Sequence, residues 1–211
     1  MTTLSKLAQH ALVPVVVLDN STDAEPLAQA LVAGGLPVAE ITFRTEAAEE
    51  SIRIMAQRGD MLIGAGTVLT VDQVDRAVAA GADYIVSPGL SHAVVKRAHE
   101  HGVLALPGAV TATEIQAAVE LGLSAVKFFP AQTSGGAPAI KALSAPFSHL
   151  SFVPTGGINA TNLRDYLSLN CVAAAGGSWM VEKTLVNEGR FDLVEKLTQE
   201  AVQLVAQIKG Q

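Results

Sequence analysis

The amino-acid sequence predicts an α/β fold, a (β/α)8 TIM barrel formed by a single compact domain of residues 1–211 with an N-terminal helix. Short apolar runs alternate with longer amphipathic segments from end to end, and the runs number eight. Hydrophobic residues make up 49% of the chain but aromatic residues only 4%, so the core must be largely aliphatic. Parallel sheets that are covered by helices on both faces have this composition. A length of 211 residues suits one domain better than two.

The eight apolar runs are the expected strands, and they begin roughly 19 to 26 residues apart, which leaves room for one helix and two tight loops in each unit. They are Val13–Leu18, Val38–Phe43, Leu62–Gly66, Tyr84–Val86, Val103–Leu106, Ala125–Phe129, Ser151–Pro154 and Cys171–Ala175. An open, doubly wound sheet is the alternative. That fold usually shows a G-x-G-x-x-G turn after its first strand, and residues 18–21 (LDNS) do not fit one.

The segments between the runs carry helix start and stop signals. Three pairs fit a capping box at a helix start: Thr22/Glu25, Thr70/Gln73 and Thr111/Glu114. Glycines where a helix would end and the next strand begin are Gly34–Gly35, Gly81, Gly102 and Gly122. Both signals support the alternation of helix and strand.

Charge and cysteine content narrow the classes of function. A formal net charge of −6 argues against a nucleic-acid or anionic-membrane surface, although a small anion could still bind locally. Cys171 is the only cysteine, so no intrachain disulfide can form. The N-terminus lacks the features of a secretory signal, and its apolar run is too short to span a membrane. We expect a cytoplasmic protein that needs no cofactor, and the histidines show no metal-binding spacing.

Two charged residues interrupt the second expected strand. Side chains alternate along a strand, so Glu40, Thr42 and Arg44 share one face, while Ile41 and Phe43 share the other. If the apolar face meets the helices, the polar face points into the barrel near the strand's carboxyl end, where barrel enzymes have their chemistry. The structural alternative is a buried ion pair between Glu40 and Arg44, or an arginine that simply reaches solvent.

The sixth expected strand contains one lysine. Lys127 shares a face with Ala125 and Phe129, and burial there would disfavour its charged ammonium form. A lysine in such a position can act as an amine nucleophile. The alternative is a lysine neutralised by a carboxylate without a covalent role, and Glu40 could be that partner.

Glycine pairs follow the last two expected strands, at Gly156–Gly157 and Gly176–Gly177. Paired glycines let backbone N–H groups approach an anion, and the loops after strands seven and eight are the recurring phosphate site of this barrel. Glycine pairs also occur in ordinary turns, but two of them at matching strand ends favour a phosphate site.

Seven segments together resemble the 2-keto-3-deoxy-6-phosphogluconate (KDPG) / 4-hydroxy-2-oxoglutarate (KHG) aldolase family, in order and over nearly the whole chain. They are EITFRTE (40–46), GAGTV (64–68), SPGL (87–90), LPG (106–108), VKFFPA (126–131), PTGGI (154–158) and GGSW (176–179). The resemblance implies a metal-independent class I aldolase, a homotrimer, that cleaves KDPG to pyruvate and glyceraldehyde 3-phosphate. Phe43 and Gln132 depart from the common pattern, which leaves specificity for the distal end of the substrate open.

The resemblance also assigns roles by position. Lys127 is implied as the Schiff-base lysine and Glu40 as the carboxylate that moves protons. The residues implied to bind substrate are Arg44 and Thr67 at the pyruvate carboxylate, Pro88 and Phe129 as walls of the pyruvate pocket, Thr155 as a further contact, and Gly156, Gly157, Gly177 and Ser178 at the phosphate.

Other functions remain open at this point. The phosphogalactonate-specific aldolase and an oxaloacetate decarboxylase of the same family share the Schiff base. A phosphosugar isomerase or epimerase would use Lys127 and Glu40 only as acid and base. A phosphosugar-acid sensor would bind ligand without turnover.

Overall fold

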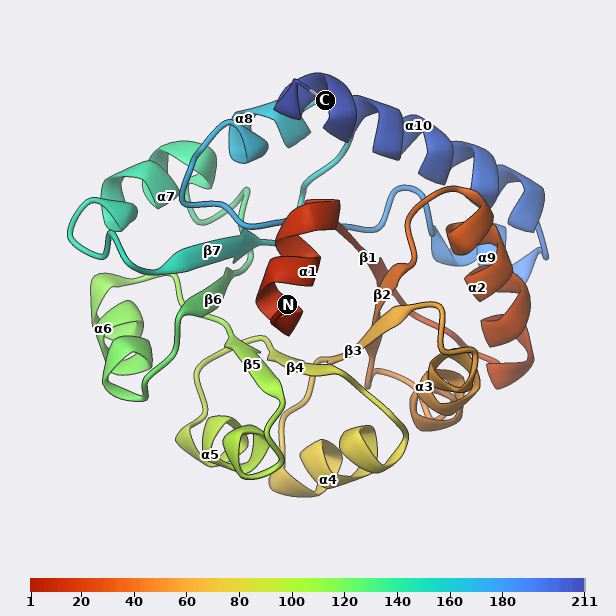
Figure 1. Cartoon of the computed structure of the whole chain (residues 1–211), viewed down its shortest axis with the longest axis horizontal. Helices are drawn as coiled ribbons and strands as arrows, with labels where there is room; N and C mark the ends of the chain where they lie inside the picture. The colour runs from red at the N-terminus through yellow and green to blue at the C-terminus, as the bar shows by residue number, and fades with distance from the viewer. Residues whose placement is uncertain (211) are drawn as a thin grey trace.

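A computed structural model describes residues 1–210, in which eight strands form an inner ring and helices surround it (Figure 1). The strands are β1 Leu12–Val16, β2 Val38–Thr42, β3 Leu62–Gly66, β4 Tyr84–Ser87, β5 Leu104–Pro107, β6 Ala125–Phe128, β7 Ser151–Pro154 and β8 Ala175–Gly177. The helices are α1 Thr3–His10, α2 Ala24–Ala33, α3 Ala48–Gln57, α4 Val71–Ala79, α5 His92–Glu100, α6 Ala112–Glu120, α7 Gly136–Ser144, α8 Leu163–Leu167, α9 Lys183–Asn187 and α10 Phe191–Lys209. The predicted alternation of strand and helix in one compact barrel is confirmed.

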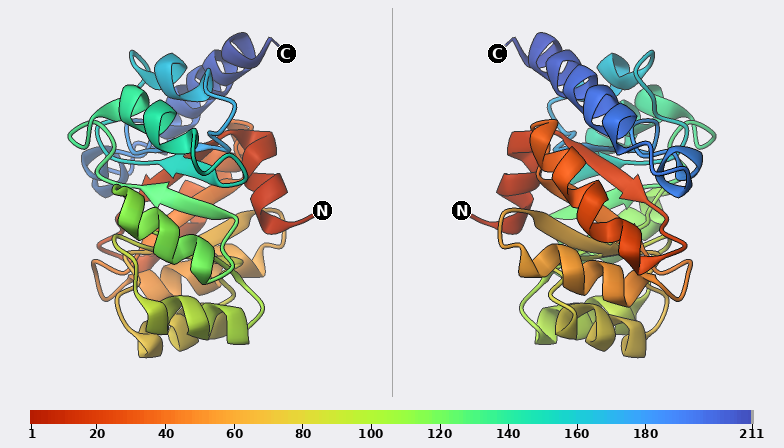
Figure 2. Two further views of the ribbon diagram at one scale, coloured as in Figure 1. Left: turned by 90° about the vertical axis from the view of Figure 1, so that its left-hand side faces the viewer. Right: turned by 90° about the vertical axis from the view of Figure 1, so that its right-hand side faces the viewer.

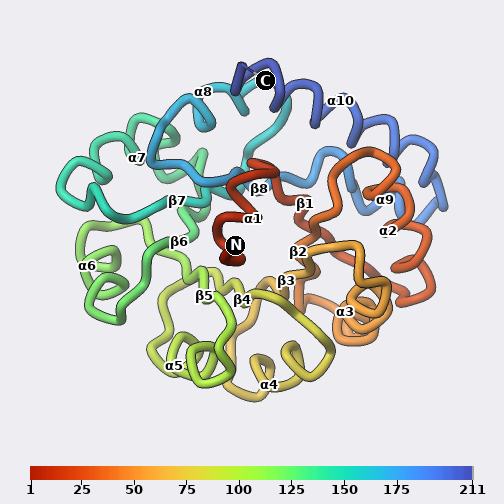
Figure 3. Tube along the Cα trace, in the orientation of Figure 1, coloured from red at the N-terminus to blue at the C-terminus, as the bar shows by residue number. Residues whose placement is uncertain are grey.

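The ring consists of two parallel ladders joined by isolated bridges. Six strands form one ladder in the order β5-β4-β3-β2-β1-β8, and β6 and β7 form the other. A bridge between Gly108 and Lys127 links β5 to β6, and a bridge between Thr155 and Gly176 links β7 to β8. These links close the barrel, as the path of the chain in Figure 3 shows.

Helix α1 lies at the end of the barrel where the strands begin. Thr2 caps it, since its side chain accepts a hydrogen bond from the backbone N–H of Ser5. The helix ends at Ala11, whose φ of 58° turns the chain into β1. Figure 1 shows α1 in front of the ring, and Figure 2 shows it at one open end. The opposite end, where the strands finish, is therefore free of this helix.

The apolar core fills both the barrel and the space between strands and helices. Tyr84 is fully buried and donates a hydrogen bond to the carbonyl of Ala39 at 3.2 Å. Outside the ring, α10 packs on α2, and Gly34 permits this approach because a Cβ there would lie 2.6 Å from the Cβ of Thr198.

The eighth strand was placed too early by the sequence. The structure has β8 at Ala175–Gly177 rather than Cys171–Ala175, and residues 175–177 pair with Leu12–Pro14 of β1. The glycine pair that was expected to follow the strand therefore belongs to the strand itself. A glycine is required within this strand, because a Cβ at Gly176 would lie 2.4 Å from Oγ1 of Thr155.

The three capping boxes have different outcomes. Thr111 and Glu114 form the full reciprocal box at the start of α6. Thr70 caps α4 through the N–H of Gln73, but the Gln73 side chain accepts from Leu69 instead of Thr70. The Thr22/Glu25 box is wrong, because Thr22 lies inside a 3-10 turn, Ser21–Asp23, that precedes α2.

Candidate active site

The predicted site residues come from strands that are far apart in the sequence and adjacent or opposite in the barrel. Glu40 and Thr42 lie on β2, Lys127 on β6 and Gly177 on β8, while Thr155 directly follows β7. In a parallel barrel all carboxyl ends share one rim, and residues there meet around a common axis. The two ladders thus contribute to one site.

Lys127 and Glu40 meet inside the barrel. The Nζ of Lys127 donates to Oε1 of Glu40 at 3.0 Å, and the two residues are 6% and 4% exposed. Glu40, the carboxylate expected to neutralise a Lys127 without a covalent role, is thus the observed partner of Lys127. A hydrogen bond between an amine and a carboxylate is also a path for a proton, so the pair can leave Lys127 as a free amine when the proton moves to Glu40.

The position of Glu40 depends on a glycine of β3. A Cβ at Gly66 would lie 2.3 Å from Oε1 of Glu40 and 2.8 Å from its Cγ, closer than real contacts allow. The Glu40 carboxylate therefore occupies the space that a side chain at residue 66 would fill. In the sequence this glycine is only part of the GAGTV motif. No pattern in a single sequence predicts which neighbouring side chain lies where a Cβ of residue 66 would be.

Tyr84 lies in the same core, where its surroundings favour the neutral hydroxyl. Burial, and secondarily the charge of Glu40, raises the pKa of the Tyr84 hydroxyl well above its usual range. Its proton is also donated to the carbonyl of Ala39. Tyr84 thus stays neutral and structural.

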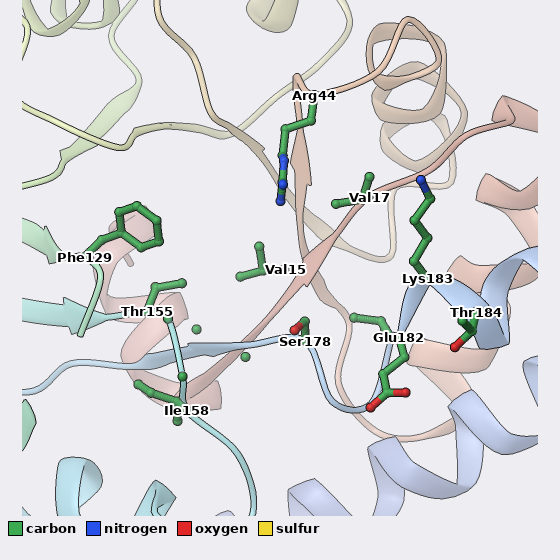
Figure 4. A pocket seen from close by; sticks show the side chains of 15 residues that line it. Val15, Val17, Arg44, Phe129, Thr155, Ile158, Ser178, Glu182, Lys183 and Thr184 are labelled. Atoms are coloured by element: carbon green, nitrogen blue, oxygen red, sulfur yellow. The ribbon is translucent and has the colours of Figure 1, made fainter. Parts of the chain in front are cut away.

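A cavity of about 490 Å³ opens at the strand ends. Its lining includes seven of the residues expected to bind substrate: Arg44, Phe129, Thr155, Gly156, Gly157, Gly177 and Ser178. Figure 4 shows the guanidinium of Arg44 pointing into this space, with Phe129 on the far side. Phe129 connects the cavity to the buried pair, because its ring centroid lies 5.2 Å from Nζ of Lys127.

Arg44 differs from its neighbours on β2. It is exposed, whereas Glu40 and Thr42 are buried, and Thr42 donates to the carbonyl of Val16 at 2.9 Å. Among residues 1–210 no carboxylate forms an ion pair with Arg44. The suggested Glu40–Arg44 pair is thus absent from the described chain. A planar guanidinium placed like this suits a carboxylate ligand.

The glycines after β7 adopt the conformation that a backbone cradle needs. Gly156 and Gly157 have φ values of +102° and +75°, which side chains other than glycine rarely adopt. Successive N–H groups in such a turn can converge on an anion. Within the described chain, Oγ1 of Thr155 is buried without a hydrogen-bond partner, so this hydroxyl is available at the cavity wall.

Thr67 and Pro88 lie at the same rim but not in the cavity lining. Thr67 directly follows β3 and has a φ of 55°, a strained value for a β-branched residue. Pro88 directly follows β4, and its carbonyl oxygen would lie 1.9 Å from a Cβ at Gly108. Thr67 and Pro88 therefore lie near the strand ends but do not line the cavity that Arg44 lines.

The sequence missed several residues that line the cavity. Val15 and Val17 come from the end of β1, and Glu182, Lys183 and Thr184 follow β8. The residues of the second group lie beyond the GGSW motif, and no pattern in the sequence marked them.

Neither a metal centre nor a membrane span is found in the part of the chain that the structure describes. Residues 1–210 contain no group of three His, Cys, Asp or Glu side chains that could hold a metal ion. No helix in the same range has the length and apolarity to cross a bilayer.

Comparison with known proteins gives consistent results. The family described as KDPG and KHG aldolase matches residues 4–197. A 2-dehydro-3-deoxy-phosphogluconate aldolase of Haemophilus influenzae is 47% identical over 203 residues, covering 96% of each chain.

Two solved structures resemble the chain closely. A KDPG aldolase from Legionella pneumophila, described with pyruvate captured as a covalent carbinolamine intermediate, has a TM-score of 0.91 at 37% identity and covers 95% of this chain and 98% of its own. The aldolase of Zymomonas mobilis ZM4, described with 3-phosphoglycerate, has a TM-score of 0.89 at 39% identity and covers 96% of this chain and 94% of its own. With a full-length family match, the same fold and a buried lysine–carboxylate pair, the chain belongs to the KDPG and KHG aldolase family.

Proposed function

We propose that this chain is a class I aldolase, a lyase that cleaves 2-keto-3-deoxy-6-phosphogluconate to pyruvate and D-glyceraldehyde 3-phosphate. The same site would cleave 4-hydroxy-2-oxoglutarate to pyruvate and glyoxylate. The observation that carries this proposal is the contact of 3.0 Å between Nζ of Lys127 and Oε1 of Glu40 inside the barrel. The relatives named above, one of them described with covalently captured pyruvate, support it.

The reaction begins when the proton shared by the pair passes to Glu40 and the free amine of Lys127 attacks the C2 ketone. As the carbinolamine forms an iminium, protonated Glu40 gives its proton to the departing hydroxyl, which leaves as water, and Glu40 is a carboxylate again. Phe129, whose ring centroid lies 5.2 Å from Nζ, shields this centre from solvent. The iminium is the electron sink for the next step.

Carbon–carbon cleavage then needs one proton acceptor. Glu40, as a carboxylate, takes the proton of the C4 hydroxyl, directly or through a water, the C3–C4 bond breaks, and its electrons form an enamine on the pyruvate fragment. The aldehyde leaves. Glu40 returns its proton to C3, and water hydrolyses the pyruvate iminium to regenerate the amine of Lys127.

The cavity explains how such a substrate would be held. Arg44 binds the C1 carboxylate in a planar fork. The family resemblance adds Thr67 as a second ligand and Pro88 as a wall of the pyruvate pocket, and both lie at the same rim outside the cavity lining. Thr155 donates its unpartnered hydroxyl to the substrate. The phosphate lies on the backbone of residues 156–157 and 177–178.

Further properties belong to the same proposal. Residues 1–211 act as one aldolase domain, the protein assembles as a homotrimer and needs no cofactor, and its partner is a small phosphorylated keto acid rather than a nucleic acid or membrane. A cytoplasmic location fits the single cysteine.

Trapping with pyruvate and sodium borohydride tests the chemistry. We expect a reduced pyruvyl adduct on Lys127 by intact mass and peptide mapping, and its loss in Lys127→Ala. Lys141→Ala is the matched control, because Lys141 is exposed on α7. An adduct that persists at another lysine would refute the assignment.

The alternatives give different results. A wild-type protein that is folded but forms no adduct would favour an isomerase, an epimerase or a sensor. An adduct together with decarboxylation of oxaloacetate, and without aldol cleavage, would indicate the decarboxylase. Comparing the C4 epimers of the substrate separates the phosphogluconate from the phosphogalactonate activity.

A further inference from the structure

One cation in the cavity has no role in the mechanism above. The charged residues of the lining are Arg44, Glu182 and Lys183, and Arg44 serves the carboxylate end of the substrate. Lys183 begins α9, shortly after β8, which ends at Gly177, and after Ser178, which directly follows that strand. It is thus a second positive charge in the cavity that contains the phosphate cradle, in a protein whose net charge is −6.

Lys183 is held at the rim by a residue from another loop. Its Nζ lies 2.9 Å from Oδ1 of Asp19, and Asn187 donates to the other carboxylate oxygen of Asp19 at 3.1 Å. Strands β1 and β8 are paired, so the loops that follow them lie side by side. Hydrogen bonding from Lys183 first, and from Asn187 second, lowers the pKa of the Asp19 carboxyl below its usual value.

This ion pair contributes little to the stability of the fold. Its side chains are 51% and 38% exposed, and pairs of this kind have a small net energy because water solvates both partners. Lysine also has a flexible four-carbon stem and can reorient at low cost. The ammonium can therefore leave Asp19 for a stronger anion within reach.

A substrate phosphate is such an anion. A phosphate monoester carries about 1.5 to 2 negative charges near pH 7, more than a single carboxylate, and offers three acceptor oxygens. Figure 4 shows the Lys183 side chain extending to the level of the Arg44 guanidinium, above Ser178, so its flexible stem has to turn toward Ser178 to reach the phosphate. The carboxylate of Glu182 points the opposite way. The one acidic side chain of the lining is thus turned away from the lysine.

We propose that Lys183 is a second cationic contact for the substrate's phosphate, exchanging the Asp19 carboxylate for that phosphate, an inference that rests on the aldolase function proposed above. Lys183 then determines the preference for phosphorylated over unphosphorylated substrates. The glycine cradle alone binds the phosphate through neutral donors, and Lys183 adds the charge.

Calorimetric titration with 3-phosphoglycerate and with glycerate tests this without requiring turnover, since the two probes differ only by the phosphate. We expect Lys183→Gln to weaken 3-phosphoglycerate binding roughly three- to tenfold and to leave the weaker binding of glycerate unchanged. Lys196→Gln is the matched control, because Lys196 is 68% exposed on α10 and pairs only loosely with Glu200, at 3.9 Å. It removes the same charge and should change neither affinity.

A double-mutant cycle tests the exchange itself. Asp19→Asn should strengthen 3-phosphoglycerate binding in the wild-type background, because it frees the ammonium, and should have a smaller effect in Lys183→Gln. An equal gain in both backgrounds would mean that Asp19 acts only as a distant charge and would overturn the exchange.

Two other outcomes would overturn the role of Lys183. One is an unchanged affinity for 3-phosphoglycerate in Lys183→Gln, and the other is a wild-type protein that binds both probes equally. Borohydride trapping of pyruvate on Lys127 in the same preparations separates these outcomes from a failure of the aldolase chemistry, because the trapping requires no phosphate.

Discussion

Replacing Gly66 by alanine should impair catalysis although no residue that reacts is replaced. The new Cβ would lie within 3.0 Å of three Glu40 atoms, at 2.3 Å from Oε1, 2.8 Å from Cγ and 2.9 Å from Cδ. Normal contacts require more than 3.4 Å, so the carboxylate must move by roughly 1 Å, a displacement that typically lowers a catalytic rate roughly 10²-fold. Overpacking of this kind also costs about 1–3 kcal/mol of stability.

The assay compares kcat/KM for KDPG cleavage with thermal unfolding. We expect kcat/KM to fall roughly 10²-fold in Gly66→Ala, while pyruvate is still trapped on Lys127. Each kcal/mol lost should lower Tm by roughly 2–4 °C in a chain of this length, so the assay is run well below Tm. Wild-type kcat/KM in Gly66→Ala would refute the steric argument.

Gly34→Ala is the matched control for overpacking. Its Cβ would lie 2.6 Å from both Cβ and Cγ2 of Thr198, at the contact of α2 with α10, and the backbone there is ordinary helix. The variant should therefore lose similar stability and keep its kcat/KM. A comparable loss of activity in Gly34→Ala would mean that general destabilisation, rather than the position of Glu40, explains both variants.

Two further predictions concern carboxylates. Glu40→Gln should still form the pyruvate imine but turn over roughly 10²-fold more slowly or worse, because the amide cannot accept the C4 proton; near-normal turnover would remove Glu40 from the chemistry. Glu114 caps α6, and hydrogen bonds, first from the backbone N–H of Val110, lower the pKa of its carboxyl. Its contribution to stability, about 1 kcal/mol or less, is therefore present above the carboxyl's unfolded-state pKa and lost as the pH falls through the lower folded-state value. Unfolding free energies of wild type and Glu114→Gln should differ at pH 7 and converge at acidic pH, once the carboxyl is protonated in the folded protein as well, and a difference that is constant with pH would contradict this account.

The barrel was predictable because local and global signals agree. Apolar runs mark the strands, left-handed glycines such as Gly81 and Gly122 stop the helices, and eight repeats favour closure. The exception is β8, where local preference and tertiary contact conflict. Glycine is a poor strand residue by itself, yet Gly176 is required in the ladder because Thr155 occupies the space of its side chain.

The site was predictable as far as strand alternation reaches. Period-two spacing put Glu40, Thr42 and Arg44 on one face, and apolar surroundings marked Lys127 as exceptional. Strand alternation cannot predict which neighbour fills the space beside a glycine, or which distant loops lie side by side. Gly66 and Lys183 therefore emerged only from the structure, the first through its clash with Glu40 and the second through the side-by-side loops after β1 and β8.

The division of the barrel into two ladders has a dynamic consequence. Lys127 lies on the ladder of β6 and β7, whereas Glu40 lies on the six-stranded ladder. Their contact of 3.0 Å therefore joins two parts of the wall that isolated bridges otherwise connect. When Lys127 becomes an iminium, its nitrogen keeps one N–H donor in place of the three of the ammonium, so the link weakens until hydrolysis restores it. Local opening of the barrel wall at β6–β7 should thus rise and fall within each catalytic cycle, in time with the entry of substrate and the departure of pyruvate.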